Sequence, residues 1–142
     1  MEQPSFLLHP QLVQDTIELV DFPLCKLLLC NDSTYPWFIL VPKVANISEI
    51  YQLDWQQQQQ LLNESSLVSE LLMQVFAGDK MNVAALGNVV EQLHVHHVVR
   101  FKTDPQWPKP IWGQQAAKPY SVTELTALKT KLLPQLAVIF QD

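Results

Sequence analysis

The chain has 142 residues, 48% of them hydrophobic, and a formal net charge of −5. This length and composition predict one globular domain over residues 1–142 and exclude an intrinsically disordered chain. The acidic balance without a Lys/Arg cluster argues against a nucleic-acid partner, and no apolar run of about 18 residues suggests a membrane span.

The N-terminal residues lack the basic and then apolar layout of a secretory signal. Cys25 and Cys30 stand in apolar surroundings, which is typical of reduced thiols in a cytosolic core. We therefore expect a cytoplasmic protein.

The first part of the chain predicts a short helical turn followed by three strands. Residues 6–14 form the turn, with Pro10 near its start. Alternating or continuous apolar runs then predict strands at residues 16–20, 25–30 and 37–41, which we expect to form an antiparallel meander.

The middle of the chain predicts a long helix and a fourth strand. Asp54 and Gln57 have the spacing of a capping box, and apolar residues then recur at helical spacing until Gly78, the expected stop. Residues 80–86 read as a strand, and Gly87 suits a tight passage into the next one.

The C-terminal part changes in composition. Residues 104–113 are rich in proline and tryptophan, and the loop is either stapled onto its own domain by buried tryptophans, a lid over a pocket, or a contact with a second subunit. Ser121 and Glu124 form a capping box that opens a last helix, which Pro134 is expected to kink or divide.

Three of the four histidines lie in residues 92–100, a run with high strand propensity. Strand alternation places Gln92, His94 and His96 on one face and His97 on the other. Adjacent imidazoles at i and i+2 suit a shared ligand, although a buried, hydrogen-bonded histidine is the plainer explanation. Zinc is only weakly indicated, because no further ligands lie nearby in sequence.

Residues 90–101 (VEQLHVHHVVRF) resemble the signature of the histidine triad (HIT) superfamily, in which histidines alternate with hydrophobic residues and Pro-Arg often closes the motif. His94 matches the middle histidine, His96 the third, and Val99-Arg100 the Pro-Arg pair. Gln92 stands where the first histidine is usual, so the motif is a Gln-x-His-x-His variant. The resemblance covers about residues 10–101.

The resemblance implies that His94 attacks the α-phosphorus of a nucleotide and forms a covalent nucleotidyl-histidine. The backbone carbonyl of Gln92 would hold the other ring nitrogen of His94, and His96 would contact phosphate or assist the leaving group. The resemblance also adds Arg100 to the substrate-binding residues. A histidine that many relatives carry is replaced here by Trp37.

The resemblance further assigns polar residues beside the motif. Asp32, or alternatively Asn31, takes the place of the residue that binds the ribose, although both also suit a plain turn. Asn82 and Asn88 match positions that touch the phosphates. Asn88 is equally explained as a turn residue, whereas asparagine inside a strand needs a partner for its amide.

The sequence thus predicts an α+β, HIT-like fold: a mainly antiparallel five-stranded sheet with a long helix and a C-terminal helix. The implied function is that of an enzyme that hydrolyses phosphoanhydride or phosphoramidate bonds of a nucleotide or dinucleoside polyphosphate, as a homodimer and without cofactor or metal. The alternatives are a catalytically weakened nucleotide-binding protein of the same fold and a zinc-dependent structural module.

Overall fold

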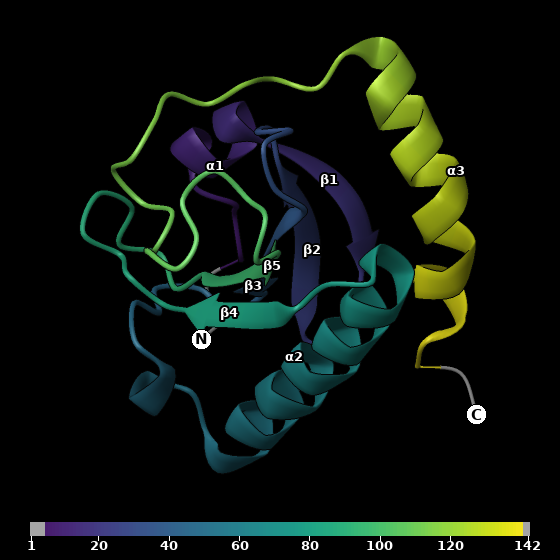
Figure 1. Cartoon of the computed structure of the whole chain (residues 1–142). Coiled ribbons are helices and arrows are strands. Elements are labelled where there is room, and N and C mark those ends of the chain that lie inside the picture. Colours follow the sequence, from purple (N-terminus) through teal and green to yellow (C-terminus); the bar gives the residue numbers. More distant parts are fainter. Residues whose placement is uncertain (1–4, 141–142) are drawn as a thin grey trace.

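The computed structural model describes residues 5–140 and contains one five-stranded sheet with helices packed on it (Figure 1). The elements in chain order are α1 (Pro10–Asp15), β1 (Thr16–Asp21), β2 (Cys25–Cys30), β3 (Trp37–Pro42), a 3-10 turn η1 (Ile50–Gln52), α2 (Trp55–Phe76), β4 (Lys80–Ala84), β5 (Val95–Arg100) and α3 (Val122–Val138).

The strands lie in the order β1-β2-β3-β5-β4, and every pairing is antiparallel. The predicted meander of the first three strands and the pairing of the last two are therefore confirmed. The fifth strand inserts between β3 and β4, with Ile39 opposite His96 on one side and Ala84 opposite His96 on the other. The motif strand is thus internal to the sheet.

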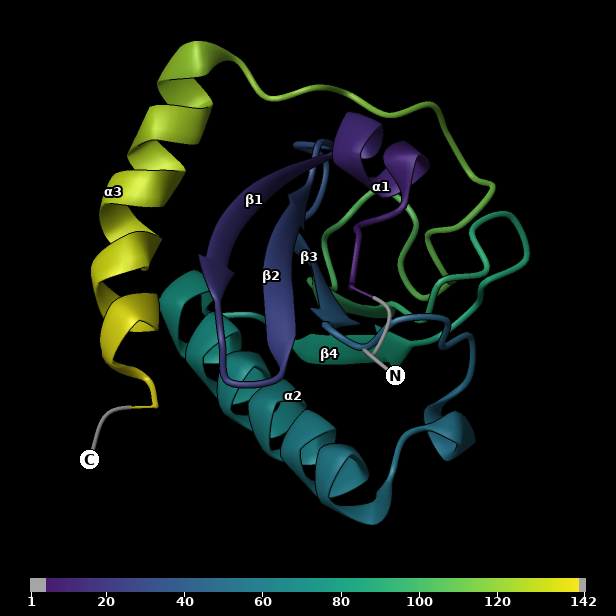
Figure 2. The same ribbon diagram turned by 180° about the vertical axis from the view of Figure 1, so that it is seen from behind.

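One face of the sheet packs against α2 and α3, as Figures 1 and 2 show from two sides. Because side chains alternate along a strand, this face takes every second residue of β2, β3 and β5. The core between sheet and helices consists mainly of Leu27, Leu29, Phe38, Leu40, Val95, Val99, Leu61, Val68, Leu72, Leu132 and Leu136.

The opposite face carries α1 and the long C-terminal segment instead. Leu28, Ile39 and Val41 of this face form a second buried cluster with Leu12 of α1 and Val90. The helix α1 begins with Pro10 at its first position, where the missing N–H costs no hydrogen bond. This second face is where the histidine pair lies.

The helix α2 starts as predicted, with Asp54 and Gln57 capping each other reciprocally. Its end differs, because Ala77 and not Gly78 adopts the left-handed conformation. Gly78 is needed for space: a Cβ atom there would lie 2.3 Å from Cγ1 of Val99. The glycine therefore lets the chain pass close to β5.

Two predicted boundaries were wrong. The motif strand begins at Val95 and not at residue 92, and β4 ends at Ala84, because residues 85–94 form a loop without ladder pairing. The helix α3 runs through Pro134 undivided. Within residues 5–140, no helix combines the length and apolarity that crossing a membrane would need.

Candidate active site

His94 lies just before β5 with its ring fixed by the backbone. Its Nδ1 atom is 2.7 Å from the carbonyl oxygen of Gln92. A carbonyl oxygen only accepts hydrogen bonds, so the proton must be on Nδ1. In the neutral ring the Nε2 atom then has the lone pair, which is the state that a nucleophilic imidazole requires.

His96, two residues further on, has the opposite tautomer. The indole N–H of Trp37 donates to Nδ1 of His96 at 2.9 Å, and an indole nitrogen cannot accept. In the neutral ring the proton is consequently on Nε2. Burial, together with the neighbouring His94 and His97, lowers the pKa of His96 to about 3. His96 is thus a neutral hydrogen-bond donor near pH 7.

The two rings stand edge to face, with centroids 5.0 Å apart, and each residue is 7% exposed. Both line a cavity of about 400 Å³, a volume within the usual range of small-molecule pockets. The other walls come from α1, from the strands β1, β2 and β3, from the loop after β4 and from the C-terminal segment: Gln11, Leu12, Asp15, Thr16, Cys30, Trp37, Ile39, Leu86, Gly87, Asn88, Val89, Val90 and Trp112.

Trp112 contributes to the wall of this cavity from the C-terminal segment. Its ring centroid is 5.3 Å from that of His96 and 6.1 Å from that of Trp37, both edge to face. Ile111 beside it is buried against Tyr35 and Val98. The proline- and tryptophan-rich loop is therefore stapled onto its own domain and also forms part of the pocket wall.

Asn31 and Asp32 lie in a second cavity, also of about 400 Å³, on the far side of Trp112. The two cavities share Asp15, Cys30, Trp37 and Trp112 as lining residues. The Oδ1 atoms of Asn31 and Asp32 accept hydrogen bonds from the backbone of Tyr120 and of Lys118, respectively. These two residues hold the C-terminal segment in place and still face a cavity adjoining the histidines.

Two buried donors border the second cavity. The Tyr35 hydroxyl and the Trp112 indole N–H have no hydrogen-bond partner within residues 5–140, and both residues line that cavity. Buried donors are rarely left unpaired. Their unpaired donors set these two residues apart from the other lining residues of that cavity.

Of the predicted phosphate contacts, only Asn88 lines the histidine cavity. Asn82 accepts a hydrogen bond from Arg100 at 3.0 Å, and Arg100 forms a buried ion pair with Asp104. The guanidinium is 2% exposed and is held away from that cavity by these partners. Neither Arg100 nor Asn82 lines the histidine cavity, so a role of these two residues in substrate binding stays a prediction.

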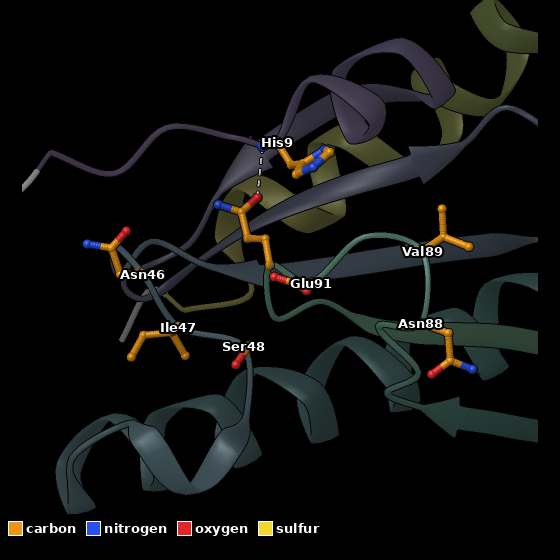
Figure 3. Close-up of a pocket in the computed structure, with 8 residues that line it drawn as sticks. His9, Asn46, Ile47, Ser48, Asn88, Val89 and Glu91 are labelled. Atoms are coloured by element: carbon orange, nitrogen blue, oxygen red, sulfur yellow. Dashed lines mark hydrogen bonds between the residues drawn. The ribbon is translucent and has the colours of Figure 1, made fainter.

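The side chain of Gln92 points away from the histidine pair, toward the N-terminal segment. Its Oε1 atom accepts from the backbone N–H of His9, and its Nε2 atom donates to the carbonyl of Leu7, both at 2.8 Å. It lines a separate polar cavity of about 500 Å³, with His9, Asn46 and Asn88 among its walls (Figure 3). That cavity is larger but contains neither histidine of the pair.

His97 faces the helices, as strand alternation predicts. It is fully buried, its Nδ1 atom donates to the carbonyl of Val95, and its Nε2 atom accepts from the Ser65 hydroxyl at 2.7 Å. Burial lowers the pKa of His97 to about 4, against the opposing effect of the Val95 hydrogen bond. His97 is a structural residue.

The site was also compared with two other kinds of chemistry, a metal centre and a cysteine nucleophile. Within residues 5–140, no three His, Cys, Asp or Glu residues are grouped so as to hold a metal ion. Cys30 lines the cavity, but burial and the nearby Asp32 raise the pKa of its thiol to about 12. A thiol that stays protonated is a poor nucleophile, which leaves His94 as the candidate.

The lowered pKa values of His96 and His97 lead us to expect a loss of stability in mild acid. His96 and His97 have pKa values in the folded protein below the ordinary value of 6.5, so in mild acid the unfolded chain binds protons that the folded chain does not. Their stabilisation is complete above pH 6.5 and is lost as the pH falls toward 4. We expect the free energy of unfolding, measured by denaturant titration, to fall by about 2 kcal/mol per histidine between pH 7 and pH 5. A His97→Gln variant with an unchanged pH dependence would contradict this.

Comparison with known proteins identifies the family. The HIT domain model matches residues 11–103, which is more than half of the chain and includes the whole motif. No curated protein matches the chain.

Solved structures agree. A histidine triad protein from Marinobacter aquaeolei VT8 is 53% identical, with a TM-score of 0.93 over 96% of this chain and 99% of that one. One from Bradyrhizobium japonicum is 42% identical, with a TM-score of 0.89 over 93% and 98%. A hypothetical histidine triad nucleotide-binding protein from Sulfolobus tokodaii shares the fold at 14% identity, with a TM-score of 0.67 over 89% of each chain. The chain thus has the HIT fold and belongs to the histidine triad family.

Proposed function

We propose that this protein is a nucleotide hydrolase or nucleotidyl transferase that works through a covalent intermediate on His94. The observation that carries the proposal is the tautomer pair: His94 presents a lone pair at Nε2, and the adjacent His96 has a proton at Nε2. A nucleophile beside a neutral donor matches the needs of attack on a phosphoryl group.

In the proposed reaction, Nε2 of His94 forms a bond to the α-phosphorus, and the bond from phosphorus to the leaving group breaks. Positive charge then spreads over the His94 ring, where the Gln92 carbonyl accepts from Nδ1 and stabilises it. His96 donates a hydrogen bond to the phosphoryl oxygens. Its low pKa makes it a fixed donor and not a source of protons, so a departing amine takes its proton from water. Water then attacks phosphorus, the bond between phosphorus and Nε2 of His94 breaks, and the proton lost by the attacking water passes to the solvent, which restores neutral His94 and replaces the proton taken up by the amine.

The charge of the site favours a leaving group without phosphates. Among the described residues 5–140, no lysine or arginine lines either of the two adjoining cavities, whereas Asp15 lines both and Asp32 lines the second. A polyphosphate leaving group would bring several negative charges to these carboxylates without a cation to offset them. We therefore infer that nucleoside phosphoramidates, with a neutral or cationic leaving group, are better substrates than dinucleoside polyphosphates.

The alternative of a catalytically weakened nucleotide-binding protein rested on Gln92 in place of the first histidine. The structure weakens its basis, because the group that orients His94 is the backbone carbonyl of Gln92, which any residue supplies. Tight nucleotide binding without turnover remains the result that would favour this alternative.

The proposal is tested with two substrates that share the same nucleoside and α-phosphate. We expect an adenosine phosphoramidate to have a kcat/KM at least about tenfold higher than a diadenosine polyphosphate, a difference of about 1.4 kcal/mol in transition-state binding. Intact-mass measurement after rapid quenching should show an adduct of one nucleoside monophosphate. Turnover without any adduct would contradict the covalent route, and a preference for the polyphosphate would contradict the charge argument.

A further inference from the structure

Gln92 links the N-terminal segment to the motif by hydrogen bonds, and the N-terminal segment leads into a helix that lines the histidine cavity. Its side-chain amide bonds both the N–H of His9 and the carbonyl of Leu7, residues that are more than 80 positions away in sequence. A carbonyl and an N–H two residues apart point to the same side of an extended backbone. The glutamine amide, with an acceptor and a donor side by side, pairs with them as a neighbouring strand would.

The segment held in this way leads directly into α1. His9 is the N-cap residue of α1, and its Nδ1 atom accepts from the N–H of Gln11. Gln11, Leu12 and Asp15 of α1 line the histidine cavity. Gln92 therefore fixes the start of the helix that walls the cavity, while its own carbonyl fixes the ring of His94. The bond to His9 is drawn in Figure 3.

We propose that Gln92 is a positioning residue whose amide sets α1 against the catalytic strand, so that the departure from the usual histidine adds a contact to the site. A histidine cannot replace it, because the two ring nitrogens of an imidazole point away from each other and cannot pair with both backbone groups. We call the two hydrogen bonds from the Gln92 amide to His9 and Leu7 the clamp. The effect on nucleotide turnover rests on the proposed function, whereas the clamp itself does not.

The first test is independent of activity and uses amide hydrogen exchange of His9, followed by NMR in the full-length protein. In the unmodified protein and in Gln92→Glu, which keeps the acceptor, the His9 amide should exchange slowly. In Gln92→Met and Gln92→His it should exchange at least about tenfold faster, because the hydrogen bond is lost. Gln58→Met is the matched control: it removes a hydrogen bond from a glutamine of α2 to the carbonyl of Leu53, just before that helix, and should leave the exchange rate of the His9 amide unchanged.

The second test is kinetic. With a nucleoside phosphoramidate, Gln92→Met and Gln92→His should raise KM about tenfold, as expected for a loss of about 1.4 kcal/mol in ground-state binding, with a smaller change in kcat. A Gln92→His variant with higher kcat and unchanged KM would overturn the proposal, as would unchanged exchange at His9 in both variants. If the unmodified protein turns over no nucleotide, the exchange result still decides the clamp, and only the proposed function fails.

Discussion

His94→Ala is expected to lower kcat/KM for a nucleoside phosphoramidate by at least about 10⁴-fold, as in other enzymes that lose their nucleophile. The alanine removes the only ring in the cavity whose Nε2 atom has a free lone pair, since Nδ1 of His96 accepts from Trp37 and its Nε2 atom has the proton. Steady-state rates and the absence of the nucleotidyl adduct in rapid-quench mass spectra would check this result.

His97→Gln is the matched control, because His97 is only three residues from His94 but faces α2. It should lower stability, through the contacts of Ser65 and Val95, and leave kcat/KM per folded molecule within a few-fold of the unmodified protein. Equal turnover by the His94→Ala variant and the unmodified protein would remove His94 from the mechanism. A loss of turnover in His97→Gln as large as in His94→Ala would show that the face assignment does not decide activity.

Arg100→Met is expected to destabilise the fold by about 3–5 kcal/mol, the usual cost of leaving one partner of a buried ion pair without the other. Nε and Nη2 of Arg100 donate to the two carboxylate oxygens of Asp104 at 2.8 and 3.0 Å, with side chains 2% and 4% exposed. The hydrogen bond from Arg100 also lowers the pKa of Asp104 to about 2. At roughly 2–4 °C per kcal/mol for a chain of this size, the melting temperature should fall by about 10 °C.

A surface ion pair provides the comparison. Lys26 pairs with Glu18 and Asp21, whose side chains are 61% and 56% exposed, so Lys26→Met should cost no more than about 1 kcal/mol. Thermal unfolding of both variants, followed by circular dichroism, separates the two cases. Equally small decreases in melting temperature for both variants would show that the ion pair of Arg100 and Asp104 does not stabilise the fold.

Several features were readable from the sequence because they depend on local spacing. Alternation in a strand separates His96 from His97 whatever the rest of the fold, and the capping pairs Asp54–Gln57 and Ser121–Glu124 are contained within single turns. The family resemblance then supplied the expected role of His94. By contrast, nothing in the spacing of α2 indicates that Glu64 is buried and accepts hydrogen bonds from the backbone N–H groups of Leu24 and Cys25.

The order of strands and helices, the common face of His94 and His96 and the α+β fold class could all be predicted from local residue patterns together with the family resemblance. The contacts between distant side chains became visible only in the folded chain. Trp37 donates a hydrogen bond to His96, Trp112 packs edge to face against His96, Gln92 accepts from His9, and Arg100 pairs with Asp104. The physical reason is that strand and helix periods repeat within a few residues, whereas these contacts join positions up to 85 residues apart, or depend on burial that only the packed fold creates.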